Sequence, residues 1–179
     1  MRTFIAIDIP KNIRKEIVKI QDSLPEFIGK KTETENLHLT LKFLGEMNEK
    51  SLEEIKKKLR EIKFQKFKTK INSVGFFDNR KSIYSKQLIV WLHMTDCKEL
   101  QREVDEKLSG LFEMEKRFMS HLTIARVKGL RNEKQFFNKL QKIKVPEMRF
   151  LIKNFSLKKS KVTRNGPIYE DIEVYNLEI

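Results

Sequence analysis

The sequence of 179 residues is poor in several residue types, with one cysteine, four prolines, six glycines and three histidines. The single cysteine, Cys97, excludes an internal disulfide framework. No glycine-rich phosphate-binding or dinucleotide-binding pattern occurs, so we expect no nucleotide cofactor. No apolar run approaches the length of a membrane span and no secretory signal peptide opens the chain, which predicts a cytoplasmic protein without membrane contact.

Several catalytic motifs are missing as well. There is no HExxH and no CxxC, and zinc sites need three or four nitrogen, sulfur or carboxylate ligands. The GxSxG nucleophile elbow of many serine hydrolases is absent. We therefore expect no bound metal, no cofactor and no serine nucleophile.

The charge of the chain is strongly one-sided. It has 38 lysines and arginines against 25 acidic residues, a formal net charge of +13. This excess indicates a polyanionic partner such as RNA, because neutralising phosphates and releasing their counterions drives nucleic-acid binding. Lysines that alternate with glutamates on helix faces are more typical of solvated surface. The acid-poor stretches 63–70, 80–86 and 153–164 are the better candidates for RNA contact.

Two of the three histidines begin the same short motif. HLTL starts at His38 and HLTI starts at His121, and each copy opens an apolar run. Side chains alternate between the faces of a β-strand, so His38 and Thr40 share one face, as do His121 and Thr123, over leucine or isoleucine in the core. Two imidazoles on facing strands can supply an acid and a base to one bond, which is the chemistry of metal-free phosphodiester cleavage.

The third histidine, His93, also has a threonine two residues later. It ends an expected strand rather than opening one, and Thr95 or Asp96 stands where the next helix needs an N-cap. We therefore expect no direct catalytic role for His93.

Each motif lies in the same order of expected elements: a strand, an amphipathic helix, the motif strand, a helix with an asparagine N-cap (Asn48 or Asn132) and a further strand. In the first half these fall at 4–9, 13–24, 38–41, 48–62 and 67–71, and in the second at 88–92, 96–111, 121–124, 132–143 and 150–152. This order predicts a single two-lobed domain over 1–179. An internal duplication relates its approximate halves, 1–80 and 87–179.

These features together resemble the two-histidine phosphoesterase superfamily, and within it the RNA 2′,3′-cyclic phosphodiesterases, also called 2′-5′ RNA ligases. The resemblance rests on the paired motifs, the opening MRTFIAIDIP, FLGE and ARVK after the two motifs, and the late segment GPIY. It implies a bilobal α+β fold with two pseudo-symmetric antiparallel sheets lining a central cleft and helices on the outer faces. The family often has proline before the second histidine, where this chain has Ser120.

The resemblance also implies a reaction: hydrolysis of an RNA terminal 2′,3′-cyclic phosphate to a 2′-phosphate. By the usual family assignment His38 is the proton donor and His121 the proton acceptor. Thr40 and Thr123 donate hydrogen bonds to the non-bridging phosphate oxygens. The alternatives are the reverse reaction, which joins RNA ends through a 2′-5′ linkage, and a noncatalytic RNA-binding module.

Two further residues are candidates for substrate binding, in a protein that we expect to be a monomer. Arg126 is either a phosphate clamp or part of a structural salt bridge. Strict alternation puts it on the face opposite His121, so the clamp requires a bulge, strand twist or loop start. Tyr169 in the GPIY segment either stacks on a base or occupies a core or turn position.

Overall fold

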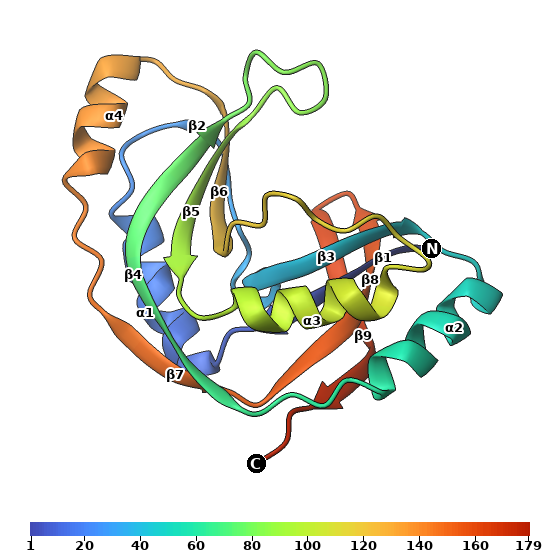
Figure 1. Cartoon of the computed structure of the whole chain (residues 1–179). Helices are drawn as coiled ribbons and strands as arrows, with labels where there is room; N and C mark the ends of the chain where they lie inside the picture. Colours follow the sequence, from blue (N-terminus) through green and yellow to red (C-terminus); the bar gives the residue numbers. More distant parts are fainter.

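The computed structural model describes residues 1–179 and has four α-helices, one short 3₁₀-helix and nine β-strands (Figure 1). In chain order the elements are β1 (Arg2–Asp8), α1 (Lys11–Asp22), β2 (Ile28–Lys31), the 3₁₀-helix η1 (Thr34–Asn36), β3 (His38–Glu46), α2 (Glu49–Arg60), β4 (Phe67–Asp78), β5 (Leu88–Met94), α3 (Lys98–Leu108), β6 (His121–Gly129), α4 (Glu133–Gln141), β7 (Met148–Ile152), β8 (Asn154–Thr163) and β9 (Gly166–Asn176). The α+β class implied by the family resemblance is confirmed.

The nine strands form one curled antiparallel sheet with the order β7-β4-β5-β6-β3-β1-β8-β9, and β2 pairs separately with β6 (Figure 1). Its two halves, β7-β4-β5-β6 and β3-β1-β8-β9, meet at a single residue pair, Leu39 with Leu122. The two sheets that the resemblance implies are therefore the two halves of one sheet. From the joining pair, β3 and β6 diverge (Figure 1).

The chain exchanges elements between these halves. β4 follows α2, yet it pairs with β5 and β7 beside the second motif strand. β8 pairs with β1 and β9 beside the first motif strand. The helices cross too, because α1 contacts β6 and α3 contacts β3. Residues 1–80 and 87–179 thus each contribute to both halves of the sheet, and a duplication between these ranges stays a prediction.

The periodic apolar positions of the sequence form the buried faces of the four helices, as predicted. These buried positions are Ile13, Ile17 and Ile20 of α1, Leu52, Ile55 and Leu59 of α2, Leu100, Val104 and Leu108 of α3, and Phe136 and Leu140 of α4. They join the apolar face of the sheet in one hydrophobic core, which leaves the opposite face of the motif strands for the polar side chains.

The N-caps of two helices are those that the sequence predicts. The Asn48 side-chain oxygen accepts a hydrogen bond from the Ser51 N–H (2.9 Å) at the start of α2. The Asn132 side-chain oxygen accepts one from the Gln135 N–H (3.0 Å) at the start of α4. Each asparagine satisfies one of the helix-end amides that have no partner inside the helix.

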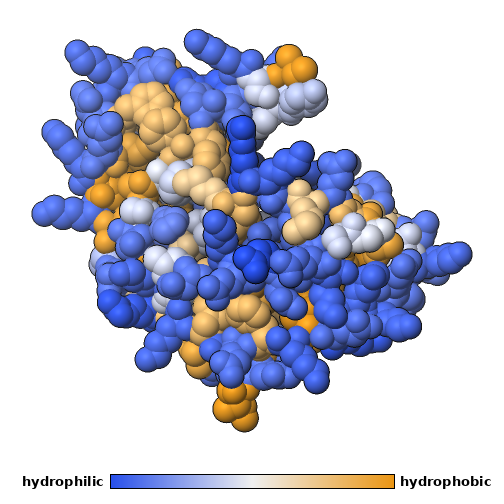
Figure 2. All heavy atoms as spheres, in the orientation of Figure 1, coloured by the Kyte–Doolittle hydropathy of each residue, from blue (hydrophilic) through white to orange (hydrophobic).

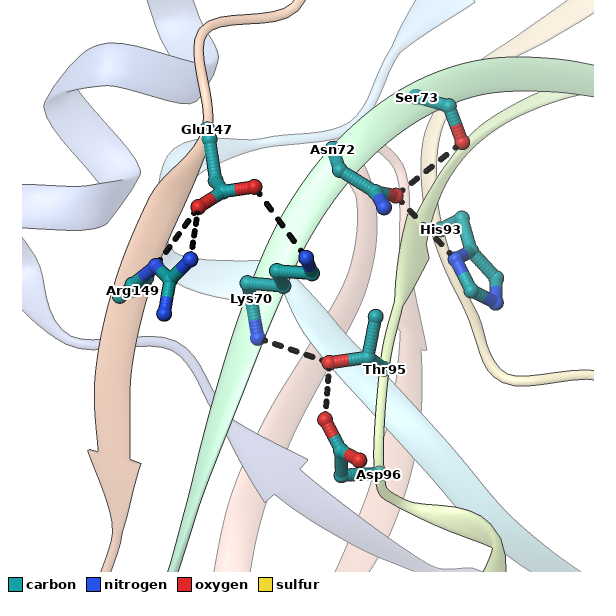
Figure 3. Close-up of polar contacts among 8 residues, drawn as sticks. All are labelled: Lys70, Asn72, Ser73, His93, Thr95, Asp96, Glu147 and Arg149. Atoms are coloured by element: carbon teal, nitrogen blue, oxygen red, sulfur yellow. Dashed lines mark hydrogen bonds and ion pairs between the residues drawn. The ribbon is translucent and has the colours of Figure 1, made fainter.

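The prediction that Asp96 or Thr95 is the N-cap of α3 is wrong. The N-cap position is Cys97, and Asp96 has a φ of 62°, in the left-handed region. The Thr95 hydroxyl accepts a hydrogen bond from the Lys70 N–H (3.2 Å) and donates one to the Asp96 carboxylate (Figure 3). Thr95 therefore ties the end of β5 to β4, and neither side chain is available to cap the helix.

A buried ion pair connects β3 to α3. Lys42 and Asp105 are 8% and 2% exposed, and the Lys42 ammonium donates to the Asp105 carboxylate and to the Glu113 carbonyl (2.8 Å). The second carboxylate oxygen of Asp105 accepts from the Glu115 N–H (2.5 Å). Since an unpaired buried charge is strongly destabilising, this pair fixes α3 and the segment before β6 against the first motif strand.

We predict that Lys42→Met lowers the free energy of unfolding by about 3–5 kcal/mol, because it leaves Asp105 buried without its cation. Urea unfolding followed by circular dichroism measures the change. Lys42→Met/Asp105→Asn should recover part of the loss, since the amide oxygen still accepts from the backbone without carrying charge. An unchanged unfolding midpoint in Lys42→Met would contradict this role of the pair.

Candidate active site

His38 and His121 are the first residues of β3 and β6, each one residue before the leucine that joins the sheet halves. In an antiparallel pair of this register, His38 lies beside Thr123 and His121 beside Thr40. Both pairs lie on the face opposite the core, because Leu39 and Leu122 are completely buried. The structure thus brings the four motif residues together around the join, related by an approximate twofold axis.

The two imidazoles are held by the same hydrogen bond. His38 Nδ1 lies 2.7 Å from the Asn36 carbonyl oxygen, and His121 Nδ1 lies 2.7 Å from the Met119 carbonyl oxygen. A carbonyl can only accept, so each Nδ1 carries a proton and donates it. The neutral form of each ring therefore has Nε2 as its free basic nitrogen. His38 Nε2 accepts a hydrogen bond from the Thr40 hydroxyl (3.0 Å).

Aromatic rings pack around His38. Its ring centroid lies 5.0 Å from that of Phe4 and 5.1 Å from that of Tyr169, which meets the imidazole edge-on at 86°. Tyr169 also contacts Phe4 edge-on, so it forms a wall of the His38 site from β9. The structure therefore places Tyr169 beside the first histidine, half-buried.

His121 has its own aromatic surroundings from the other half of the sheet. Phe77 meets its ring edge-on at 5.0 Å between centroids, and Trp91 lies at 6.3 Å. Trp91 in turn lies directly over Gly75, where an added Cβ would be 2.3 Å from the indole. Only glycine leaves room for the indole at this point of β4.

Burial controls the protonation of both histidines. It lowers the pKa of His38 to about 4, against smaller opposing effects of the Asn36 carbonyl and the nearby Asp8 carboxylate. Burial also lowers the pKa of His121, opposed by the Met119 carbonyl. Withdrawing a charged imidazolium from water is unfavourable, so the neutral form of each ring is favoured in the free protein.

A lysine linked to two carboxylates lies next to His38. Lys158, 7% exposed, contacts Asp8 at 3.0 Å and Asp171 at 2.5 Å. Asp8 is the register partner of His38 in the β1–β3 pairing, which places this network on the same face as the imidazole. Sequence patterns do not reveal this network, because Asp8 of β1 lies far along the chain from Lys158 and Asp171 of the β8–β9 hairpin.

A β-bulge brings Arg126 to the site. The register of β5 with β6 shifts between Val90 and Trp91, so Ile124 and Ala125 are both buried and the alternation restarts at Arg126. This is the condition that the sequence analysis set for Arg126 to share the face of His121. The positive charge of Arg126 lowers the pKa of both histidines, so its guanidinium is within electrostatic range of the two rings. None of the salt bridges involves Arg126.

An equivalent bulge in β3 exposes a residue that the sequence analysis missed. The β1–β3 register shifts between Ile5 and Ala6, and Phe43 then shares the face of His38 with 70% of its surface exposed. Phe43 and Arg126 each stand five residues after a motif histidine. Aligning the two motifs over six residues rather than four would have identified both positions.

This fold and these paired histidines are those of a two-histidine phosphoesterase. The family model described as LigT like Phosphoesterase matches residues 7–84 and 94–169. The chain belongs to this family, which confirms the resemblance seen in the sequence.

Individual relatives cover nearly the whole chain. A protein of Methanocaldococcus jannaschii named RNA 2′,3′-cyclic phosphodiesterase is 41% identical over 175 residues, which cover 97% of this chain and 99% of that protein. A protein of Archaeoglobus fulgidus with the same name is 39% identical, with 98% and 99% covered. The crystal structure of E. coli LigT complexed with 3′-AMP is 22% identical, with a TM-score of 0.77 over 98% of this chain and 97% of that one. At this identity the structural likeness supports the fold alone.

Two other findings concern metals and membranes. No three histidine, cysteine, aspartate or glutamate side chains gather in an arrangement that could hold a metal ion. Every helix is too short or too polar to cross a lipid bilayer.

We predict that Gly75→Ala raises the pKa of His121 toward its ordinary value. The added methyl group displaces the indole of Trp91, and the imidazole then becomes more accessible to water. NMR titration of the histidine ring protons measures the shift. Gly110→Ala is the matched control, because a methyl group there meets nothing within 4 Å. An unchanged His121 titration in Gly75→Ala would show that this packing does not control the imidazole.

Proposed function

We propose that the protein hydrolyses the 2′,3′-cyclic phosphate at an RNA end to a 2′-phosphate, using its two histidines without a metal ion. The observation that carries the proposal is the paired site at the join of the sheet. Each imidazole there donates its Nδ1 proton to a carbonyl, which leaves Nε2 as the basic nitrogen, and a threonine of the other motif lies beside each ring. In the free protein, His38 Nε2 accepts a hydrogen bond from Thr40 of its own motif. The names of the relatives support the substrate class.

In the proposed step, water attacks phosphorus opposite the 3′-oxygen. Neutral His121 takes the water proton at Nε2 while the new P–O bond forms, and protonated His38 gives its Nε2 proton to the departing 3′-oxygen as that P–O bond breaks. Thr40 and Thr123 donate hydroxyl hydrogen bonds to the non-bridging oxygens, whose charge grows in the transition state. The division of roles between the histidines follows the family resemblance.

The proposal requires substrate to change the protonation of His38. Its pKa of about 4 in the free protein favours the base form, whereas a proton donor must be charged. A bound cyclic phosphate brings a negative charge close to Nε2, which stabilises the imidazolium. Asp8 acts in the same direction on His38, and Lys158, which is paired with Asp8, opposes it.

The two bulge positions supply the remaining substrate contacts. Arg126 has no carboxylate partner and lies in range of both imidazoles, which favours the phosphate clamp over a structural salt bridge. Phe43 presents an exposed ring on the other side of the join, suited to stacking on the terminal base. Tyr169, packed edge-on against His38, shapes the imidazole site instead. A cytoplasmic location and a monomeric state stay predictions.

The test is incubation of an oligonucleotide ending in a 2′,3′-cyclic phosphate with the protein and excess EDTA. We expect complete conversion to the 2′-phosphate, and His38→Ala and His121→Ala should each lower turnover by a factor of about 10² to 10⁴ with the fold intact. His93→Ala is a stringent control, because His93 lies directly across from His121 in the β5–β6 pairing. It should stay close to wild type.

The outcomes separate the alternatives. A joined product with added 5′-hydroxyl RNA would identify 2′-5′ ligation at the same site, and RNA binding without turnover would leave only the binding module. Near-normal activity in either motif variant would refute the paired mechanism. Activity that disappears in EDTA and returns with a divalent ion would refute the metal-free one.

The assignment of acid and base has its own prediction. Adenosine 2′-phosphate, a product analogue, should raise the pKa of His38 above about 4, because its phosphate faces Nε2 with negative charge. NMR titration with and without the nucleotide gives both histidine pKa values, and the His38→Ala variant assigns the signals. If only the pKa of His121 rose, the roles of the two histidines would be reversed.

A further inference from the structure

The loop between β4 and β5, residues 79–87, exposes two apolar side chains that no other part of the chain covers. Ile83 is 81% exposed and Tyr84 is 91% exposed. The loop projects past the ends of the neighbouring strands, and its tip stands clear of the surface beside a hollow (Figures 1 and 2). Neighbouring exposed apolar residues on a projecting loop are typical of a binding surface.

The base of this hairpin loop is firmly anchored. Arg80 donates to both carboxylate oxygens of Asp78 (2.8 and 2.7 Å) and to Glu133 of α4 (2.6 Å). Its guanidinium also lies 5.9 Å from the ring centroid of Phe137. The charge of Arg80 is therefore used within the protein, and the base of the loop is tied to α4.

The free positive charge of the hairpin loop is at its tip. Lys81 and Lys86 flank the apolar pair, both exposed and without a salt bridge. Cations beside an exposed aromatic ring suit single-stranded nucleic acid, since every base has a face that stacks and every phosphate a charge to neutralise.

A basic path connects this loop to the proposed active site. On β6 the alternation that restarts at Arg126 places Lys128 on the same face. Arg126 and Val127 pair with Ile89 and Leu88, the residues that follow the hairpin loop. From Thr123 to Lys128 the strand extends by roughly 16 Å, at about 3.3 Å per residue, which is longer than one nucleotide.

The opposite direction from His121 is less suited to an RNA backbone. Beyond His93 lie Lys70 and Arg149, whose charges are both paired with Glu147 (3.3 and 2.5 Å) (Figure 3). Asp96 adds a further carboxylate close by. Lys70 and Arg149 are thus both engaged with Glu147, and the carboxylates here would repel phosphates.

We propose that the RNA nucleotides preceding the cyclic phosphate run along β6 past Arg126 and Lys128 to the hairpin loop. There Tyr84 stacks on a base, while Lys81 and Lys86 neutralise phosphates. This inference rests on the proposed function and adds a second contact region, which a cyclic mononucleotide is too short to reach.

The test compares adenosine 2′,3′-cyclic phosphate with a ten-nucleotide RNA that ends in a 2′,3′-cyclic phosphate. Ile83→Ser/Tyr84→Ala should lower kcat/KM for the oligonucleotide about tenfold, mainly through KM, because stacking on one aromatic ring contributes about that factor. Hydrolysis of the mononucleotide should not change. Ile179→Ser is the control, since it removes a fully exposed apolar side chain at the far end of the molecule (Figure 1).

The contribution of Lys81 and Lys86 is measured separately, by the salt dependence of oligonucleotide binding. Lys81→Gln/Lys86→Gln should reduce the slope of log oligonucleotide affinity against log salt by about 0.7 for each lysine that contacts a phosphate. Lys50→Gln/Lys57→Gln is the control. It removes the same number of positive charges as the loop variant, at two exposed lysines of α2 that form no salt bridge.

The outcomes distinguish this inference from the proposed function. If the wild type cleaves neither substrate, the proposed function fails. If it cleaves both and the loop variants lose nothing, or lose equally on both substrates, the RNA path is wrong and the function stands. A wild-type dimer that the Ile83→Ser/Tyr84→Ala variant converts to monomers, with oligonucleotide cleavage unchanged, would identify the loop as a contact between subunits.

Discussion

The backbone pairing of Leu39 with Leu122 is the contact on which the candidate site depends. It is the single point at which the two halves of the sheet meet, and both leucines are completely buried. The histidine of each motif directly precedes its leucine, so any shift in this register would move one imidazole away from the other motif. A slip of one residue would turn every side chain of that strand to the opposite face. The core beneath the pair therefore determines the geometry of the chemistry above it.

The two bulges show how one backbone arrangement supports two different tasks. In each motif strand the alternation breaks after the threonine and restarts five residues after the histidine. One copy presents the positive charge of Arg126 and the other the exposed ring of Phe43. The buried residue of the bulge differs as well, since β3 has Lys42, paired with Asp105, where β6 has Ala125. The two motif strands thus have similar backbones but different side chains. This difference suits a nucleotide, which has a phosphate on one side and a base on the other.

Features that depend on neighbouring residues were predictable from the sequence. The apolar stripes of the helices, the asparagine caps of α2 and α4, and the shared face of His38 and Thr40 follow from local periodicity and hydrogen-bonding chemistry. Features that depend on distant partners were not predictable. Alternation alone put Arg126 on the wrong face, because the bulge arises from the register with β5.

The same limit explains the other differences between prediction and structure. The predicted cap at Asp96 or Thr95 failed because Thr95 bonds to β4 and to the Asp96 carboxylate instead of to the helix. The Lys42–Asp105 pair joins a strand to a helix of the other half of the chain. In a sequence this basic, a single lysine such as Lys42 is indistinguishable from a surface residue.

The exchange of strands also has a consequence for synthesis of the protein. β1 is made long before its outer neighbour β8, and Phe4 beside His38 pairs with Lys158 of that strand. Such distant pairings must wait for loop closure over most of the chain and slow folding. Until β8 and β9 have been synthesised, the wall of Tyr169 and the Lys158 network beside His38 do not exist. During synthesis, in the RNA-rich surroundings of the ribosome, the first histidine motif would therefore remain incomplete until these two strands are made and pair with β1.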